Sequence, residues 1–234
     1  MSRRNIFRKT SSVTQNMGSY AQLPITLCLD TSGSMRGHPI NELNAGLRMF
    51  YDCVKKNYES KYSADISIVT FGGYNDVTRI QDFAHVDEIS VPPSLKAEGT
   101  TPMGEAVNLS LDMLDNRKKY YRSIGSTYYH SWLILMTDGE PNGSEIELSR
   151  AISRAQDLVT RNKLVVFPLA IGNEANINTL AQFSPKMRPV ALKGLNFKGF
   201  FEWLSVSVQV VSTNKPGNPV NLPKVDGTWG SIII

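Results

Sequence analysis

Short apolar runs, far apart in the sequence, constrain the fold of this chain most strongly. Residues 24–30 read PITLCLD, residues 131–137 read SWLILMT and residues 164–171 read LVVFPLAI. Such runs lack the regular polar alternation of a half-exposed strand and are typical of strands buried on both faces of a parallel sheet. Helical spacing follows the first run, in Ile40, Leu43, Leu47, Phe50 and Val54. Strands that alternate with helices predict an α/β fold.

The segments between and after these runs complete the pattern. Residues 65–71 and 76–83 are strand-like and too close for an intervening helix, so they predict an antiparallel hairpin. Helical spacing returns from Met103 to Leu114 and over residues 146–161. A short helix over 176–182 and a strand over 189–192 follow. We therefore expect a doubly wound, mostly parallel central sheet with one antiparallel edge strand and helices on both faces.

Residues 200–211, FFEWLSVSVQVV, fit two structures. Val206, Val208 and Val210 alternate like a strand, whereas Phe200, Leu204, Val208 and Val211 have helical spacing. A final helix would cover the sheet, so we predict a helix.

The composition supports one domain with two flanking segments. A chain of 234 residues with 41% hydrophobic residues is long enough for one sizeable core. We expect a basic, flexible arm over residues 1–22, a folded domain over 23–212 and a tail rich in Pro, Gly and Asn over 213–234. The arm also has the composition of a transit peptide. The tail ends in Trp229 and three isoleucines, so it either packs back on the domain or adds a strand to a partner's sheet.

The charge distribution argues against nucleic-acid binding. The formal net charge is +4, but the first 22 residues carry four of the 25 basic residues and no acid, which leaves 21 residues of each sign elsewhere. A nucleic-acid-binding protein would gather Lys and Arg on a folded surface. No segment resembles a membrane span or a signal peptide, so we expect a cytoplasmic protein. In a reducing compartment Cys28 and Cys53 are expected to remain thiols.

Polar residues gather where three of the predicted elements meet loops. Asp30, Ser32 and Ser34 follow the first strand, Thr100 or Thr101 precedes a helix, and Asp138 follows a later strand. Ligand sites of doubly wound folds lie at the carboxyl ends of the strands, so these residues are candidates to converge. An extended loop would point Asp30, Ser32 and Ser34 to one side. The all-oxygen set favours Mg²⁺, with Mn²⁺ or Ca²⁺ as alternatives.

At these residues the sequence resembles a known family. DTSGSM after an apolar strand, TPMG at the start of a helix and MTDGEP after another strand resemble the von Willebrand factor type A (vWA) domain and its metal-ion-dependent adhesion site (MIDAS). The likeness runs from about Leu23 to Ser212. The longer stretches DTSGSMRGHPINELNAGL, EGTTPMGEA and FFEWLSVSV look most like stand-alone bacterial proteins of the TerY-like tellurite-resistance group.

The resemblance implies roles for individual residues. Ser32, Ser34 and Thr101 would contact the metal through hydroxyls, while Asp30 and Asp138 would act directly or through water. Neutral hydroxyls leave the cation electron-poor, so that an Asp or Glu of a protein partner would complete its coordination. The group's context implies a stress-response, tellurite-resistance or phage-defence complex with a protein kinase and a PP2C-type phosphatase.

A rim and two alternatives complete the hypotheses. Arg36, His38, Tyr74 and Thr100 are candidates for a partner-binding rim, although ordinary solvated loop residues would show the same pattern. One alternative is a metal-dependent phosphohydrolase with Asp30 as the nucleophile. It is disfavoured because Ser32 stands where one such class has a second Asp. The other is a vWA scaffold that binds partners without metal.

Overall fold

The computed structural model describes residues 20–73 and 77–233. Its elements are β1 (Leu23–Asp30), η1 (Gly33–Met35), α2 (His38–Lys56), α3 (Tyr58–Ser63), β2 (Ala64–Phe71), β3 (Val77–His85), α4 (Met103–Ser123), β4 (Ser131–Thr137), α5 (Glu145–Thr160), β5 (Leu164–Ala170), α6 (Ile177–Gln182), β6 (Val190–Leu192), α7 (Phe197–Ser212) and β7 (Gly230–Ile232). The expected strands and helices are present. The short helix α3 was not expected from the sequence.

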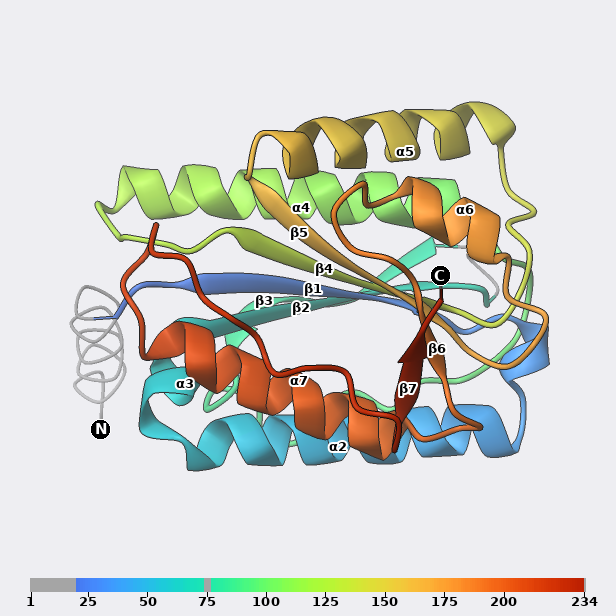
Figure 1. Ribbon diagram of the computed structural model, residues 1–234, viewed down its shortest axis with the longest axis horizontal. Helices are drawn as coiled ribbons and strands as arrows, with labels where there is room; N and C mark the ends of the chain where they lie inside the picture. Colours follow the sequence, from blue (N-terminus) through green and yellow to red (C-terminus); the bar gives the residue numbers. More distant parts are fainter. Residues whose placement is uncertain (1–19, 74–76, 234) are drawn as a thin grey trace, which may run out of the picture.

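The strands form one sheet in the order β3-β2-β1-β4-β5-β6-β7 (Figure 1). The pairs from β2 to β6 are parallel, and β3 is antiparallel to β2 at one edge. The expected fold class is confirmed. The other edge adds a feature that was not expected: β7 pairs antiparallel with β6, because the C-terminal tail turns back along the sheet.

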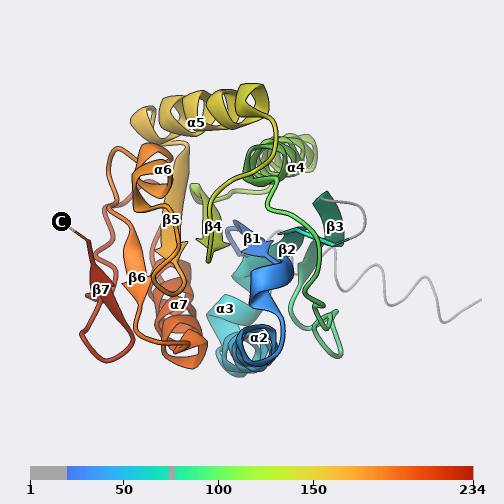
Figure 2. The same ribbon diagram turned by 90° about the vertical axis from the view of Figure 1, so that its right-hand side faces the viewer.

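Helices cover both faces of the sheet, as Figure 2 shows. One face packs against α4, α5 and α6, and the opposite face against α2, α3 and α7, each over its own apolar cluster. Strand β1 lies between β2 and β4 and is buried at every position, because helices exclude water from both of its sides. Its continuous apolar sequence is therefore what its place in the sheet requires.

The ambiguous segment near the C-terminus is helical. Helix α7 buries Phe200, Leu204 and Val208 against the sheet and packs along α2. The Asn196 side chain caps it by accepting a hydrogen bond from the Gly199 amide at 2.9 Å. The burial available to a full apolar face outweighs the strand-like alternation of the valines, and Val206 is left exposed.

Both flanking segments include packed residues. Residues 1–19 lie outside the described residues. Gln22, which was expected in the flexible arm, is fully buried, and its backbone amide donates to the Thr127 carbonyl at 2.9 Å. In the tail, Trp229 is only 3% exposed, so the tail packs back on the domain. Cys28 and Cys53 are both free thiols, as expected.

The topology defines where a site is expected. From β1 the chain crosses to β2 on one side, whereas from β4 it crosses to β5 on the other, so the direction of winding reverses between β1 and β4. Ligand sites in doubly wound sheets lie at the carboxyl ends of the strands that flank this point. Asp30 ends β1 and Asp138 directly follows β4.

Candidate functional site

Asp30 is buried at the carboxyl end of β1. Its Oδ1 accepts a hydrogen bond from the Ser32 amide at 2.8 Å, and its Oδ2 accepts one from the Thr137 hydroxyl at 2.6 Å. Thr137 is the last residue of β4, so the two strands that flank the reversal point hold this carboxylate between them. Both oxygens of this side chain therefore accept a hydrogen bond from a neighbouring group.

The loop after β1 differs from the expected extended conformation. Gly33–Met35 form a turn of 3₁₀ helix. The turn still brings the hydroxyl oxygens of Ser32 and Ser34 within 3.0 Å of each other, and Ser34 donates to Asp138 Oδ1 at 2.8 Å. Because a hydroxyl has one proton, the Ser32 hydroxyl donates to Ser34. Asp30, Ser32, Ser34 and Asp138 thus form one hydrogen-bonded series, which we call the Asp30–Asp138 series.

Thr101 is held beside the loop that follows Asp138. Its amide donates to Asn142 Oδ1 at 2.6 Å, and the Asn142 amide donates to the Thr101 carbonyl at 3.1 Å. The preceding residues reach the first loop, where the Gly33 amide donates to the Gly99 carbonyl at 3.1 Å. Thr101 is 6% exposed, whereas Thr100 is exposed. Backbone contacts therefore bring together the loops that carry Ser32, Thr101 and Asp138.

Two glycines permit the close approach of these loops. Gly72 and Gly99 both have positive φ, +110° and +78°. A Cβ on Gly72 would lie 2.5 Å from the Thr31 backbone, and one on Gly99 would lie 2.5 Å from the Gly73 carbonyl oxygen. Any side chain at either position would push the loops apart.

Burial raises the pKa of both carboxyl groups. Desolvation raises the pKa of Asp30 to about 6, opposed by its hydrogen bonds from Thr137 and Ser32 and reinforced by the charge of Asp138. Desolvation also raises the pKa of Asp138, partly offset by the bond from Ser34, while the charge of Glu174 adds to the increase. Two carboxylates close together in a partly dry site favour a cation as a third component.

The residues present fit a small hard cation. Within residues 20–73 and 77–233 no group of three His, Cys, Asp or Glu side chains is placed to hold a metal, so a metal there needs hydroxyl ligands. In the Asp30–Asp138 series the serine protons point toward neighbouring oxygens, which leaves hydroxyl lone pairs available for a cation. Two carboxylates with neutral hydroxyls match the oxygen preference of Mg²⁺.

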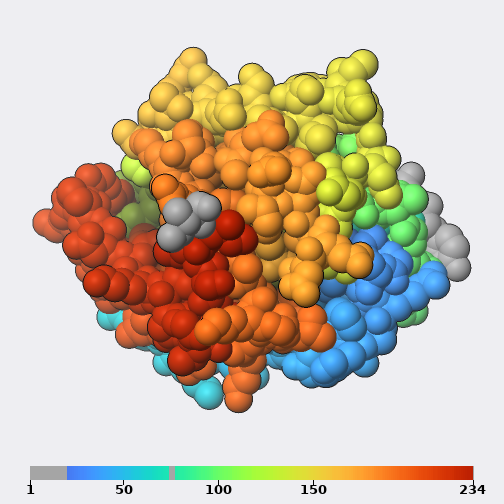
Figure 3. Space-filling model, turned by 45° about the vertical axis from the view of Figure 1, so that its right-hand side comes forward, coloured from blue at the N-terminus to red at the C-terminus, as the bar shows by residue number. Residues whose placement is uncertain are grey.

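The rim candidates occupy different positions. Arg36 is exposed, and its Nε donates to the Ala97 carbonyl at 3.3 Å. His38 is the first residue of α2, and its Nδ1 lies 3.8 Å from Oε1 of Glu42, one turn along the helix. Thr100 is exposed next to Thr101, and Tyr74 lies outside the described residues. Figure 3 shows the 30s (blue) beside segments near 100 (green), 140 (yellow) and 172 (light orange) on one side of the surface.

Sequence reasoning missed two residues that position the candidate site. Thr137 donates to Asp30, and Asn142 joins the loop after Asp138 to Thr101. Thr137 directly precedes Asp138 at a strand end, so its hydroxyl was a visible signal. Asn142 follows a Gly-Glu-Pro turn, and nothing in the local pattern pointed to Thr101, 41 positions away.

A comparison with family models assigns the chain. The model of the von Willebrand factor type A domain matches residues 25–198, which include the whole candidate site. The chain belongs to the von Willebrand factor type A domain family. Type A domains often mediate metal-dependent protein interactions and are in general non-enzymatic. A search of curated proteins found no match.

Solved structures share the type A fold. A von Willebrand factor type A protein from Catenulispora acidiphila superposes with a TM-score of 0.59 at 14% identity, over 81% of this chain and 43% of that chain. The vWF domain of the type V pili tip protein Mfa5 from Porphyromonas gingivalis superposes with a TM-score of 0.60 at 10% identity, over 85% of this chain and 99% of that chain. Proximal thread matrix protein 1 from the mussel byssus, with a zinc-occupied MIDAS motif, superposes with a TM-score of 0.53 at 14% identity, over 81% of this chain and 48% of that chain.

Because the sequence identities are only 10–14%, these solved structures establish the fold alone. The present chain spans less than half of the Catenulispora and mussel chains that it matches. Across the described part of the type A domain, no helix is both long and apolar enough to cross a membrane.

Proposed function

We propose that this type A domain is a non-enzymatic, divalent-metal-dependent protein-interaction module. Asp30, Ser32, Ser34, Thr101 and Asp138 would hold the metal, with Mg²⁺ as the preferred ion and Mn²⁺ or Ca²⁺ as alternatives. When bound, the ion supplies an electron-poor centre that accepts an anionic oxygen. The partner would provide that oxygen from an Asp or Glu side chain.

The observation that carries this proposal is the Asp30–Asp138 series at the reversal point of the sheet. Four of the five residues are joined through hydrogen bonds of 2.8–3.0 Å, although Ser34 and Asp138 are 104 positions apart. The fifth, Thr101, lies on a loop bonded to the loop after Asp138. The zinc-occupied MIDAS motif of the mussel protein supports a metal in this fold.

The mixture of ligands gives the reason for recruiting a partner. Three of the five side chains are neutral hydroxyls, and the Asp30 carboxylate is already engaged by the Ser32 amide and the Thr137 hydroxyl. The protein therefore offers less negative charge than a closed calcium site with several carboxylates. An additional carboxylate would be attracted strongly, and Arg36 and His38 would form part of the rim that selects it.

The cellular setting rests on resemblance. We propose a cytoplasmic protein of the TerY-like group, acting in a stress-response, tellurite-resistance or phage-defence complex with a protein kinase and a PP2C-type phosphatase. The long motif stretches around Asp30 and Thr101 support the grouping. An affinity pull-down from the native host, with Mg²⁺ or with EDTA, tests it. Capture of such enzymes only with Mg²⁺ supports the setting, and capture unaffected by EDTA argues against the metal-dependent part.

Calorimetric titration of the protein with Mg²⁺ and Mn²⁺ tests the metal itself. We expect saturable binding by the wild type and loss of binding in Ser32→Ala/Ser34→Ala. Ser149→Ala, at an exposed serine of α5, is the control and should bind as the wild type does. If the double variant binds the metal as tightly as the wild type, Ser32 and Ser34 are excluded as metal ligands.

An assay with a generic phosphate ester and Mg²⁺ tests the non-enzymatic part. We expect no turnover above that of buffer. Turnover that disappears in Asp30→Ala would replace the proposal with a phosphohydrolase.

A further inference from the structure

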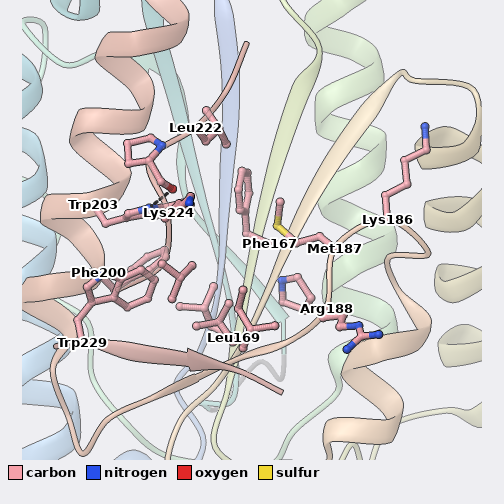
Figure 4. A pocket seen from close by; sticks show the side chains of 15 residues that line it. Phe167, Leu169, Lys186, Met187, Arg188, Phe200, Trp203, Leu222, Lys224 and Trp229 are labelled. Atoms are coloured by element: carbon pink, nitrogen blue, oxygen red, sulfur yellow. Dashed lines mark hydrogen bonds between the residues drawn. The ribbon is translucent and has the colours of Figure 1, made fainter. Parts of the chain in front are cut away.

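An apolar cavity of about 430 Å³ lies on the face of the sheet covered by α7, apart from the candidate metal site. Phe167 and Leu169 of β5 form one wall, and Phe200 and Trp203 of α7 form another (Figure 4). Small-ligand pockets typically measure about 300–1,000 Å³. The cavity has the size of a ligand site.

The C-terminal tail completes the cavity. The Trp203 indole donates to the Pro223 carbonyl at 2.9 Å, and the Trp229 carbonyl accepts from the Lys193 amide at 2.9 Å. The rings of Trp203 and Trp229 lie 5.5 Å apart, and that of Phe200 lies 5.6 Å from Trp229. These contacts hold the aromatic walls in place.

The charges at the cavity are all of one sign. Its lining includes Lys186, Arg188 and Lys224 and neither Asp nor Glu. The Lys186 ammonium bonds to Asn162 Oδ1 at 2.5 Å, and Figure 4 shows its side chain extending away from the other lining residues. Among the described residues, neither Arg188 nor Lys224 takes part in an ion pair. Arg188 and Lys224 lie on different sides of the cavity (Figure 4), so a ligand with an apolar body and one anionic end meets a cation at either side.

We propose that this cavity binds a free fatty carboxylate. The acyl chain lies between the aromatic walls, and the carboxylate pairs at the surface with one of the two cations, Arg188 or Lys224. A free acid fits better than a membrane lipid, because the cavity that the tail borders has a volume suited to a single short chain. This site is independent of the proposed metal site, whose residues lie at the carboxyl ends of β1 and β4.

Intrinsic fluorescence offers a direct assay. The chain has three tryptophans. Trp203 and Trp229 line the cavity, and the ring of Trp132 lies 5.1 Å from that of Phe167. The full-length protein is titrated with decanoate below its micelle-forming concentration, in EDTA so that the carboxylate has no metal to bind. Decanol and decyltrimethylammonium are titrated in parallel as neutral and cationic probes of the same chain length.

We expect saturable one-to-one binding of decanoate, at least tenfold tighter than that of decanol or of the cation. Arg188→Gln/Lys224→Gln, two changes at exposed side chains, should remove that tenfold preference, while the control Lys186→Gln should retain it. Val225 is a half-buried tail residue that lines the cavity. Val225→Phe should weaken the binding of both decanoate and decanol, while circular dichroism shows an intact fold. Equal affinity for the three probes, or no saturable binding, would overturn the proposal whatever the outcome for the metal.

Discussion

Ser34 donates a hydrogen bond to Asp138 at 2.8 Å, which joins the turn after β1 to the loop after β4 across 104 positions of the sequence. The bond directs the single proton of Ser34 toward the carboxylate, and one oxygen lone pair stays available beside the one that accepts from Ser32. Removing this hydroxyl should therefore affect metal binding more than folding. We expect Ser34→Ala to weaken Mg²⁺ binding at least tenfold in calorimetry.

The exposure of Ser34 limits the effect of this substitution on stability. An exposed hydrogen bond contributes on the order of 1 kcal/mol or less to the free energy of unfolding. Urea denaturation in EDTA should show a change of that size. Unchanged Mg²⁺ affinity in a folded Ser34→Ala variant would exclude Ser34 as a ligand.

The raised pKa of Asp30 predicts that this residue destabilises the metal-free fold at neutral pH. Its pKa is about 6 in the folded protein against an ordinary value of 3.8. Its stabilising contribution is complete below about pH 4 and is lost as the pH rises through 6, because the folded state binds the proton more tightly than the unfolded state. Asp30→Asn removes the charge and should raise the free energy of unfolding at pH 7 by about 1–3 kcal/mol in EDTA.

Paired urea denaturation of wild type and Asp30→Asn at pH 4 and pH 7 measures this effect. The difference between the proteins should be near zero at pH 4 and appear at pH 7. Mg²⁺ should stabilise the wild type alone. A variant that is equally destabilised at both pH values would mean that the hydrogen bonds of Asp30 outweigh its desolvation.

Thr101 and its neighbour provide a matched pair for the third hydroxyl. Thr101 is buried beside Asn142, whereas Thr100 is exposed. We expect Thr101→Ala to weaken Mg²⁺ binding at least tenfold and Thr100→Ala to leave it within about twofold in the same titration. If Thr100→Ala weakens binding and Thr101→Ala does not, the metal ligand is Thr100 instead of Thr101.

Gly99 should be intolerant of any side chain. Gly99→Ala places a Cβ 2.5 Å from the Gly73 carbonyl oxygen at a φ of +78°. The control Gly217→Ala has a similar φ of +89° but no atom within 4 Å of the added Cβ. Both substitutions carry the cost of a positive φ, about 1–2 kcal/mol, and Gly99→Ala adds the steric conflict. Urea denaturation should show the larger loss for Gly99→Ala, and equal losses would show that the loop accommodates the methyl group.

The tail should contribute to stability through Trp229. The side chain is 3% exposed and packs against Phe200 and Trp203. Trp229→Ala should lower the free energy of unfolding, toward the lower end of about 3–5 kcal/mol, because the side chain borders an existing cavity. A chain that ends at Thr213 should also melt at a lower temperature. An unchanged melting temperature would assign the tail to a partner instead.

The fold was largely predictable because its signals are local. The apolar runs at β1, β4 and β5 predict buried strands. The spacing of Phe200, Leu204, Val208 and Val211 predicted α7 only together with the expectation that a final helix covers the sheet. The errors lie where a distant contact overrides a local pattern. The antiparallel strand β7 comes from a Pro- and Gly-rich tail, and it forms because the open edge of β6 pairs its backbone groups.

The candidate site was predicted in part for the same reason. The residue types and their order were readable, and the topology of the sheet brings Asp30 and Asp138 to one edge. The 3₁₀ turn at Gly33 was not predicted, and neither was the bond from the Gly33 amide to Gly99, which lies on a distant loop. Neither was the role of Asn142, whose partner lies on another element.

The sequence by itself determined the alternation of strands and helices, the oxygen-rich loops and the family resemblance, because these follow from residue chemistry and from the fixed periods of backbone geometry. Only the tertiary structure decided that Ser34 reaches Asp138, that Thr137 holds the buried Asp30, and that the tail borders an apolar cavity lined by cations. Those properties depend on burial and on contacts between distant segments, which arise when the loops close and the layers pack.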